Sequence, residues 1–198
     1  MGLEVADRSL HGALSQLAGG DDDCREAAAV ALGGMGPAVI GPLSALLDSP
    51  DVALRWWATR ALAEVGGQSA VAPLTHALAD DDADVRACAC LALGKVGAAS
   101  AAGALAERLG DDSVFVAAVA ADALAMLGPG AVDVLAQMLL HHRPTVRLHA
   151  VRALGRIGSQ QAVEPLCRAL DDTSYLVSRC ALDALEELGV GMVYFPPG

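Results

Sequence analysis

A short basic segment is the first place in the sequence where chemistry could occur. Residues 141–156, HHRPTVRLHAVRALGR, hold four arginines and three histidines and no acid, in a chain of net charge −11. On a helix, Arg152 and Arg156 would stand one turn apart on the same face. Two guanidinium groups so placed can clamp a carboxylate or a phosphate. The same residues would also make an ordinary solvated helix face, and the sequence leaves both interpretations open.

The segment belongs to a repeating chain, and the repeat predicts its elements. Six glycines recur at intervals of 30 or 31 residues: Gly36, Gly66, Gly97, Gly128, Gly158 and Gly189. Each repeat carries three further shared residues at fixed distances before its glycine. One is a leucine in the first predicted helix, and the other two are a leucine and an alanine in the second predicted helix. Residues 69–97 show the pattern most clearly, with helices of about 10 and 14 residues. Asp80 to Asp82 are expected to cap the second helix, and Gly97 to end it in a left-handed conformation.

The repeat predicts one domain without an internal linker. Its boundaries are 1–198, with units at about 6–36, 37–66, 67–97, 98–128, 129–158 and 159–189, and a tail at 190–198. An arginine recurs just inside the second helix, and three of the four copies follow an aspartate by four residues. The arginines are Arg25, Arg55, Arg86 and Arg147, and the aspartates are Asp21, Asp51 and Asp82. We interpret them as a ladder that bridges neighbouring units and caps helices.

Composition limits the classes of function. Apolar residues make up 54% of the chain and aromatic residues only 3%, which favours closely packed helices over sheets. No apolar run is long enough to span a membrane. Five cysteines without paired spacing and an N-terminus without a secretory pattern predict a cytoplasmic protein. The acidic charge argues against nucleic-acid binding and suits either solubility or a basic partner.

The repeat motif resembles a known family. The pattern AVxPLxxAL, then Asp, then VRxxAxxALGxIG appears at residues 70–97 and 162–189 and in part at 131–158. It resembles the HEAT-like repeat of phycobilin (phycobilisome) lyase subunits. The resemblance implies an all-α fold, a right-handed α-solenoid of about six HEAT-like helix pairs with a 30–31-residue period. The fourth unit departs from the motif, because Ala104 replaces the proline and Ala117 the arginine.

Residues that break the repeat at exposed positions are the candidate binding site. The resemblance implies that the second helices line a concave wall, where large apolar residues are unexpected. The sixth unit carries Arg179, Asp183 and Glu187 at these positions and contributes no candidate. The candidates for partner binding are Trp56, Arg60, Leu91, Phe115, Asp122, Met126, Leu148, Arg152 and Arg156. Trp56 leads this set, with burial under a neighbouring side chain as the alternative.

Histidine and cysteine spacing argues against a metal or redox site. His141, His142 and His149 form no pair four residues apart and have no carboxylate at ligand spacing. No histidine is followed by glutamate, which argues against the iron site of helical-repeat hydroxylases. Cys88 and Cys90 suit small-residue packing better than thiol chemistry. The sequence therefore assigns no catalytic, cofactor-binding or metal-binding residue.

Three functions are compatible with these residues. The first is a non-catalytic scaffold that binds a protein or peptide on its concave face. The second, which the resemblance implies, is a subunit of a phycobilin lyase or a related chromophore-handling factor. Its ligand or substrate would be a bilin, and its partner an apo-phycobiliprotein. The third is a HEAT-like DNA glycosylase, for which Trp56, Asp122 and Arg152 are the ingredients and which the acidity of the chain opposes.

Overall fold

The computed structural model describes residues 2–190, with side chains from residue 8 onward. These residues form helices joined by turns, with no strand among them, so the all-α prediction is confirmed. Contacts between Cα atoms divide the chain into two compact units, Met1–Ala104 and Leu105–Gly198. The single-domain boundary stays a prediction. Residues 191–198 of the predicted tail lie outside the described part.

The first unit is built of helix pairs. Its helices are α1 (Gly2–Gly19), α2 (Asp22–Gly34), α3 (Ile40–Leu46), α4 (Val52–Val65), α5 (Gly67–Ala77) and α6 (Ala83–Val96). Within each pair the first helix packs on the second: α1 on α2, α3 on α4 and α5 on α6. The second helices also contact one another in chain order, α2 with α4 and α4 with α6. The predicted helix–turn–helix unit is therefore the building block.

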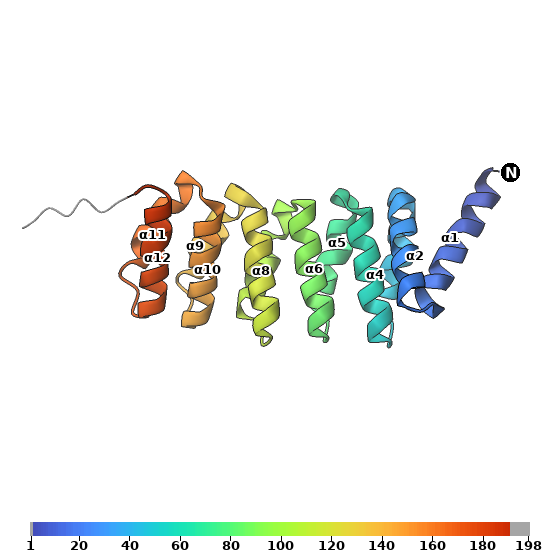
Figure 1. Ribbon diagram of the computed structural model, residues 1–198, viewed down its shortest axis with the longest axis horizontal. Helices are drawn as coiled ribbons and strands as arrows, with labels where there is room; N and C mark the ends of the chain where they lie inside the picture. Colours follow the sequence, from blue (N-terminus) through green and yellow to red (C-terminus); the bar gives the residue numbers. More distant parts are fainter. Residues whose placement is uncertain (1, 191–198) are drawn as a thin grey trace, which may run out of the picture. The chain divides into compact units, whose positions relative to one another are not determined.

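The second unit repeats this arrangement. Helix α7 (Ala102–Glu107) spans the division between the units, and α8 (Val114–Met126), α9 (Val132–Met138), α10 (Pro144–Ile157), α11 (Val163–Ala169) and α12 (Tyr175–Glu187) follow. Helices α9 and α11 pack on α10 and α12, and α10 contacts both α8 and α12. Figure 1 shows α8, α10 and α12 side by side, yellow through red. These three neighbours present one shared face.

The second helices have about the predicted length, and α5, with 11 residues, has the length predicted for a first helix. Three other first helices are shorter. Helices α4, α6 and α10 have 14 residues each, whereas α3, α9 and α11 have seven. Each of these three short helices follows a 3₁₀ segment, the tighter turn common at helix starts. The 3₁₀ segments are Gly36–Val39, Ala99–Ala101, Arg108–Gly110, Gly128–Ala131 and Gln160–Ala162. All six recurring glycines have positive φ, and Gly97 ends α6 in the predicted left-handed conformation.

The core is formed by the positions that repeat. The alanine of the second helix is at most 1% exposed in all six copies: Ala28, Ala58, Ala89, Ala120, Ala150 and Ala181. The leucine of that helix is at most 2% exposed, at Leu32, Leu62, Leu93, Leu124, Leu154 and Leu185. In the first helices, Leu139 and Leu170 are half-buried while the other four leucines are buried. Buried alanine lets neighbouring helices approach closely, as the sequence predicts.

Arginine–aspartate pairs connect successive repeats within each unit. Arg147 Nε and Nη2 donate to the two carboxylate oxygens of Asp172 at 2.6 and 2.8 Å, and Arg55 binds Asp80 in the same way at 2.7 and 2.9 Å. We call these two pairs the arginine–aspartate ladder. Asp51 and Asp82 instead cap α4 and α6 by accepting backbone N–H groups. The predicted bridges and caps are both present, but the bridging acids are not the predicted aspartates: each stands 25 residues after its arginine.

The ladder adds a pH-dependent part to stability. Hydrogen bonds from Arg147 lower the pKa of the Asp172 carboxyl, against partial burial, which acts to raise it. A carboxyl whose pKa is lowered by folding stabilises the fold above its unfolded pKa of about 3.9. That stabilisation is lost as the pH falls through the lower pKa of the folded state.

Two rungs of the ladder are missing, and the sequence explains both. Asp80 and Asp172 each stand 17 residues before the recurring glycine of their repeat. In the repeat that follows Arg25, this position is occupied by Ser49, which carries no charge. Arg25 Nε is buried without a hydrogen-bond partner among the described residues. In the second unit the arginine position is Ala117 and the matching acid position is His141. Because both the arginine and the acid are absent there, no buried charge lacks a partner at this rung.

Replacing Arg147 with methionine should destabilise the fold by about 2–3 kcal/mol, because the Asp172 carboxylate would lose its charged donor while remaining largely buried. Urea unfolding of the two proteins measures the difference. Arg168→Met is the matched control: Arg168 pairs with Glu164 at 2.6 Å, but both side chains are largely exposed, so stability should change little. Equal losses in the two variants would contradict a structural role for the ladder.

Candidate functional site

The structure distributes the nine candidate residues over four second helices. The first unit carries Trp56 and Arg60 on α4 and Leu91 on α6. The second unit carries the other six, from α8 and α10: Phe115, Asp122, Met126, Leu148, Arg152 and Arg156. The first unit thus holds three of the candidates and the second unit six.

In the first unit the candidates are largely engaged with neighbouring residues. Trp56 is half-buried, and its ring meets Trp57 edge to face with centroids 4.8 Å apart. Arg60 binds Glu64 one turn later and Glu26 Oε1 on α2 at 3.0 Å. Only Leu91 combines a large apolar side chain with substantial exposure, at 42%. A role for these three residues in partner binding stays a prediction.

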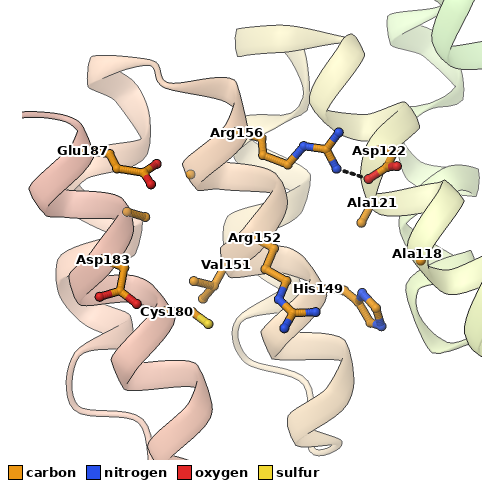
Figure 2. Close-up of a pocket in the computed structure, with 12 residues that line it drawn as sticks. Ala118, Ala121, Asp122, His149, Val151, Arg152, Arg156, Cys180, Asp183 and Glu187 are labelled. Atoms are coloured by element: carbon orange, nitrogen blue, oxygen red, sulfur yellow. Dashed lines mark hydrogen bonds and ion pairs between the residues drawn. The ribbon is translucent and has the colours of Figure 1, made fainter.

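In the second unit three of the candidates line one open cleft. The cleft has a volume of about 330 Å³ and lies over α8, α10 and α12 (Figure 2). Asp122, Arg152 and Arg156 are the candidates in its lining. The other lining residues are Ala118, Ala121, His149, Val151, Gly155, Cys180, Asp183, Ala184 and Glu187. We call this feature the α10 cleft, after the helix at its centre.

Small residues make room for the α10 cleft. A Cβ atom added to Gly155 would lie 2.9 Å from the Cβ atom of Ala184 on α12, closer than side chains normally approach. Glycine at this position therefore lets α10 pack closely against α12. On the α8 side the lining residues Ala118 and Ala121 are also small, so their side chains take little of the cleft's volume.

Of the two arginines in the cleft, one is already paired and one is free to bind a partner. Arg156 makes an ion pair with Asp122 on α8, which Figure 2 shows as a dashed line. On α12, Arg179 Nη2 lies 2.8 Å from Asp183 Oδ1. Arg152 and Glu187 have no ion pair or hydrogen bond within the described part of the chain, and both side chains are exposed. The cleft therefore presents one unpaired cation and one unpaired anion.

His149 is a neutral member of the lining near pH 7. Burial lowers its pKa, the nearby Arg152 lowers it further, and Asp122 acts in the opposite direction. A neutral imidazole can donate and accept hydrogen bonds without adding charge. In the described residues no group of three or more His, Cys, Asp or Glu side chains is placed to hold a metal ion.

Cys88 is not an activated thiol. Burial raises the pKa of Cys88 to about 11, outweighing the nearby cations Arg60 and Lys95. The thiol therefore stays protonated at neutral pH, and a protonated thiol is a poor nucleophile. Cys180 is half-buried in the α10 cleft.

Four polar lining residues were not among the candidates chosen from the sequence. They are His149, Cys180, Asp183 and Glu187. Asp183 and Glu187 occupy the repeat positions of Arg152 and Arg156, six and two residues before the terminal glycine. That reversal of charge between adjacent repeats is the signal that could have found them. Conversely, Phe115 and Met126 are 61% and 49% exposed on α8 but lie outside the cleft lining, as does the half-buried Leu148.

Comparison with known proteins identifies the family. The family model for HEAT repeats matches residues 10–87, 40–125 and 132–190. The chain belongs to the HEAT-repeat family. No curated protein sequence matches it. In the described residues no helix is long and apolar enough to cross a membrane.

Solved structures support the resemblance drawn from the motif. A chain in the structure of the complex of CpcE and CpcF of phycocyanin lyase from Nostoc sp. PCC7120 is 26% identical to this HEAT-repeat chain, with a TM-score of 0.54. The match covers 89% of this chain and 76% of that one. An engineered protein is 25% identical with a TM-score of 0.50, over 91% and 96% of the two chains. Human deoxyhypusine hydroxylase, in complex with glycerol, is 24% identical with a TM-score of 0.52 over 93% and 75%, a likeness of fold alone.

Replacing Gly155 with alanine should lower stability by about 1 kcal/mol, because the overlap with Ala184 outweighs the better helix propensity of alanine. The double variant Gly155→Ala, Ala184→Gly should recover most of this loss in urea unfolding. Gly103→Ala on α7 is the control, since no atom would lie within 4 Å of its new Cβ; it should not destabilise. A neutral Gly155→Ala variant would show that α10 and α12 do not need this close approach.

Proposed function

We propose that this HEAT-repeat protein is a non-catalytic scaffold that binds a segment of another protein on the face formed by α8, α10 and α12. The observation that carries the proposal is the unpaired guanidinium of Arg152 in a cleft kept open by small residues. Arginine is enriched where protein partners bind, because its planar group makes several directed hydrogen bonds. The binding role needs no catalytic group in the cleft.

The surroundings of the cleft support a protein partner. Phe115 and Met126 expose apolar surface on α8, the helix that forms one side of the cleft. Aromatic residues and methionine are enriched at protein interfaces. Nucleic acid is a poorer partner, because each phosphate contact needs a cation and the chain carries a net charge of −11.

Replacing Arg152 with glutamine should reduce capture of the native partner at least tenfold, because a partner hydrogen-bonded to the guanidinium would be left unpaired. Affinity purification from cells that naturally make the protein, followed by quantitative mass spectrometry, measures this loss. Arg168→Gln removes an arginine of α11 outside the cleft and should leave capture unchanged. The thermal melt of Arg152→Gln should match the original, since its side chain is exposed and unpaired. Equal capture by both variants would reject the proposed face.

A second function is favoured by the similarity to the CpcE and CpcF complex of phycocyanin lyase, at 26% identity over 89% of this chain. In this alternative the chain is a subunit of a phycobilin lyase or handles a related chromophore, and the α10 cleft holds part of an open-chain tetrapyrrole. A propionate of the bilin would then meet Arg152.

Mixing the protein with phycocyanobilin would test the alternative by visible absorbance and fluorescence. A lyase-type protein should shift the bilin spectrum, because a bound open-chain tetrapyrrole is held in a restricted conformation. The shift should weaken in Arg152→Gln and persist in Arg168→Gln. An unchanged spectrum, also in the presence of an apo-phycobiliprotein, would reject this function and leave the scaffold proposal untouched.

A further inference from the structure

The charges of the α10 cleft point to the chemistry of its occupant. We infer that the cleft takes a partner segment of mixed charge, whose carboxylate binds Arg152 on α10 and whose ammonium or guanidinium group binds Glu187 on α12. This inference rests on the proposed binding function and makes it specific. It follows from which charges in the lining are already paired and which are not.

The α10 side of the cleft provides a single free cation. Arg156, one turn after Arg152, is held by Asp122 from the neighbouring helix. His149, one turn before Arg152, has a lowered pKa and stays neutral. An incoming carboxylate therefore finds its strongest partner in Arg152. Figure 2 shows the Arg152 side chain extending from α10 among these lining residues.

The α12 side provides a single free anion. Asp183 is paired with Arg179 on its own helix. Glu187, one turn later, is exposed and makes no ion pair in the part of the chain that the structure describes. In Figure 2 the Glu187 carboxylate reaches from α12 toward α10. An incoming cation therefore finds its free partner there.

Arg152 and Glu187 do not neutralise each other, although both line the same cleft. They lie on adjacent helices, and no ion pair joins them in the described residues. A partner with one charge of each sign would satisfy both groups without adding net charge to the cleft. A purely acidic partner would be repelled by Glu187 and by the acidic protein as a whole, and a purely basic one by Arg152.

The size of the cleft suits side chains rather than a large ligand. Its volume of about 330 Å³ is near the lower limit of about 300–1,000 Å³ for small-molecule sites. The floor is apolar where Val151, Gly155 and Ala184 meet. A segment crossing α10 could thus place a small apolar residue on this floor between its two charged residues.

A library of random 12-residue peptides displayed on phage would test the inference without a known partner. The library is selected in parallel on the original protein, Arg152→Gln, Glu187→Gln and the control Arg168→Gln. A fifth protein, Ala118→Trp, fills the cleft from an exposed lining position and defines which peptides depend on the cleft. Basic peptides that adhere to the acidic surface elsewhere are recognised because Ala118→Trp leaves them bound.

Cleft-dependent peptides from the original protein should carry one acidic and one basic residue at a fixed spacing. Selection on Arg152→Gln should lose the acidic preference alone, and selection on Glu187→Gln the basic preference alone. Fluorescence anisotropy should show at least a tenfold loss of affinity for each matching variant. Asp122→Asn frees Arg156 and should tighten binding of the same peptides severalfold.

The outcomes separate this inference from the function it rests on. Cleft-dependent peptides without the paired charge preference would overturn the mixed-charge inference and leave the scaffold function standing. The complete absence of peptides that lose binding in Ala118→Trp would overturn both. Weaker binding to Asp122→Asn would also overturn the inference, because it would show that Asp122 does not compete with the partner for arginine.

Discussion

Burial of a small residue at one position of every second helix is the constraint on which the structure depends. Each of the six second helices buries an alanine at the same position, and none of these alanines is more than 1% exposed. A larger side chain there would overpack a core that tolerates little added volume. Within each unit, these small residues let neighbouring helices pack at a short spacing.

The arginine–aspartate ladder and the α10 cleft both depend on this spacing. The two-pronged contact between Arg147 and Asp172 needs the two repeats at one separation, because a guanidinium group fits a carboxylate in one plane. The cleft continues the same small-residue packing to the surface, where Gly155 meets Ala184. The core and the candidate site are therefore consequences of one geometry, and only the surface residues differ between repeats.

Sequence reasoning predicted the fold well because the repeat encodes it six times. Three predictions for the second helix are confirmed: a left-handed end at Gly97, a buried leucine at Leu93 and an N-terminal cap at Asp82. The bridging acid was harder to find, since Asp172 follows Arg147 by 25 residues and belongs to the next repeat. The short length of α3, α9 and α11 was not predicted, because their starts tighten into 3₁₀ turns that no residue pattern marks clearly.

The candidate site was only partly predictable, for a physical reason. Exposed positions could be identified from helical periodicity, and Arg152 and Arg156 were found in that way. Periodicity within one helix says nothing about charges on its neighbours, so the pairing of Arg156 with Asp122 became visible only when α8 and α10 were placed together. The apparent clamp of two arginines is thereby reduced to one free guanidinium beside a paired one. In a repeat protein, the residue that the adjacent repeat places opposite a charged side chain thus decides whether that charge is free to bind a partner. A substitution at Asp122 would therefore change the cleft as much as a substitution at Arg156 itself.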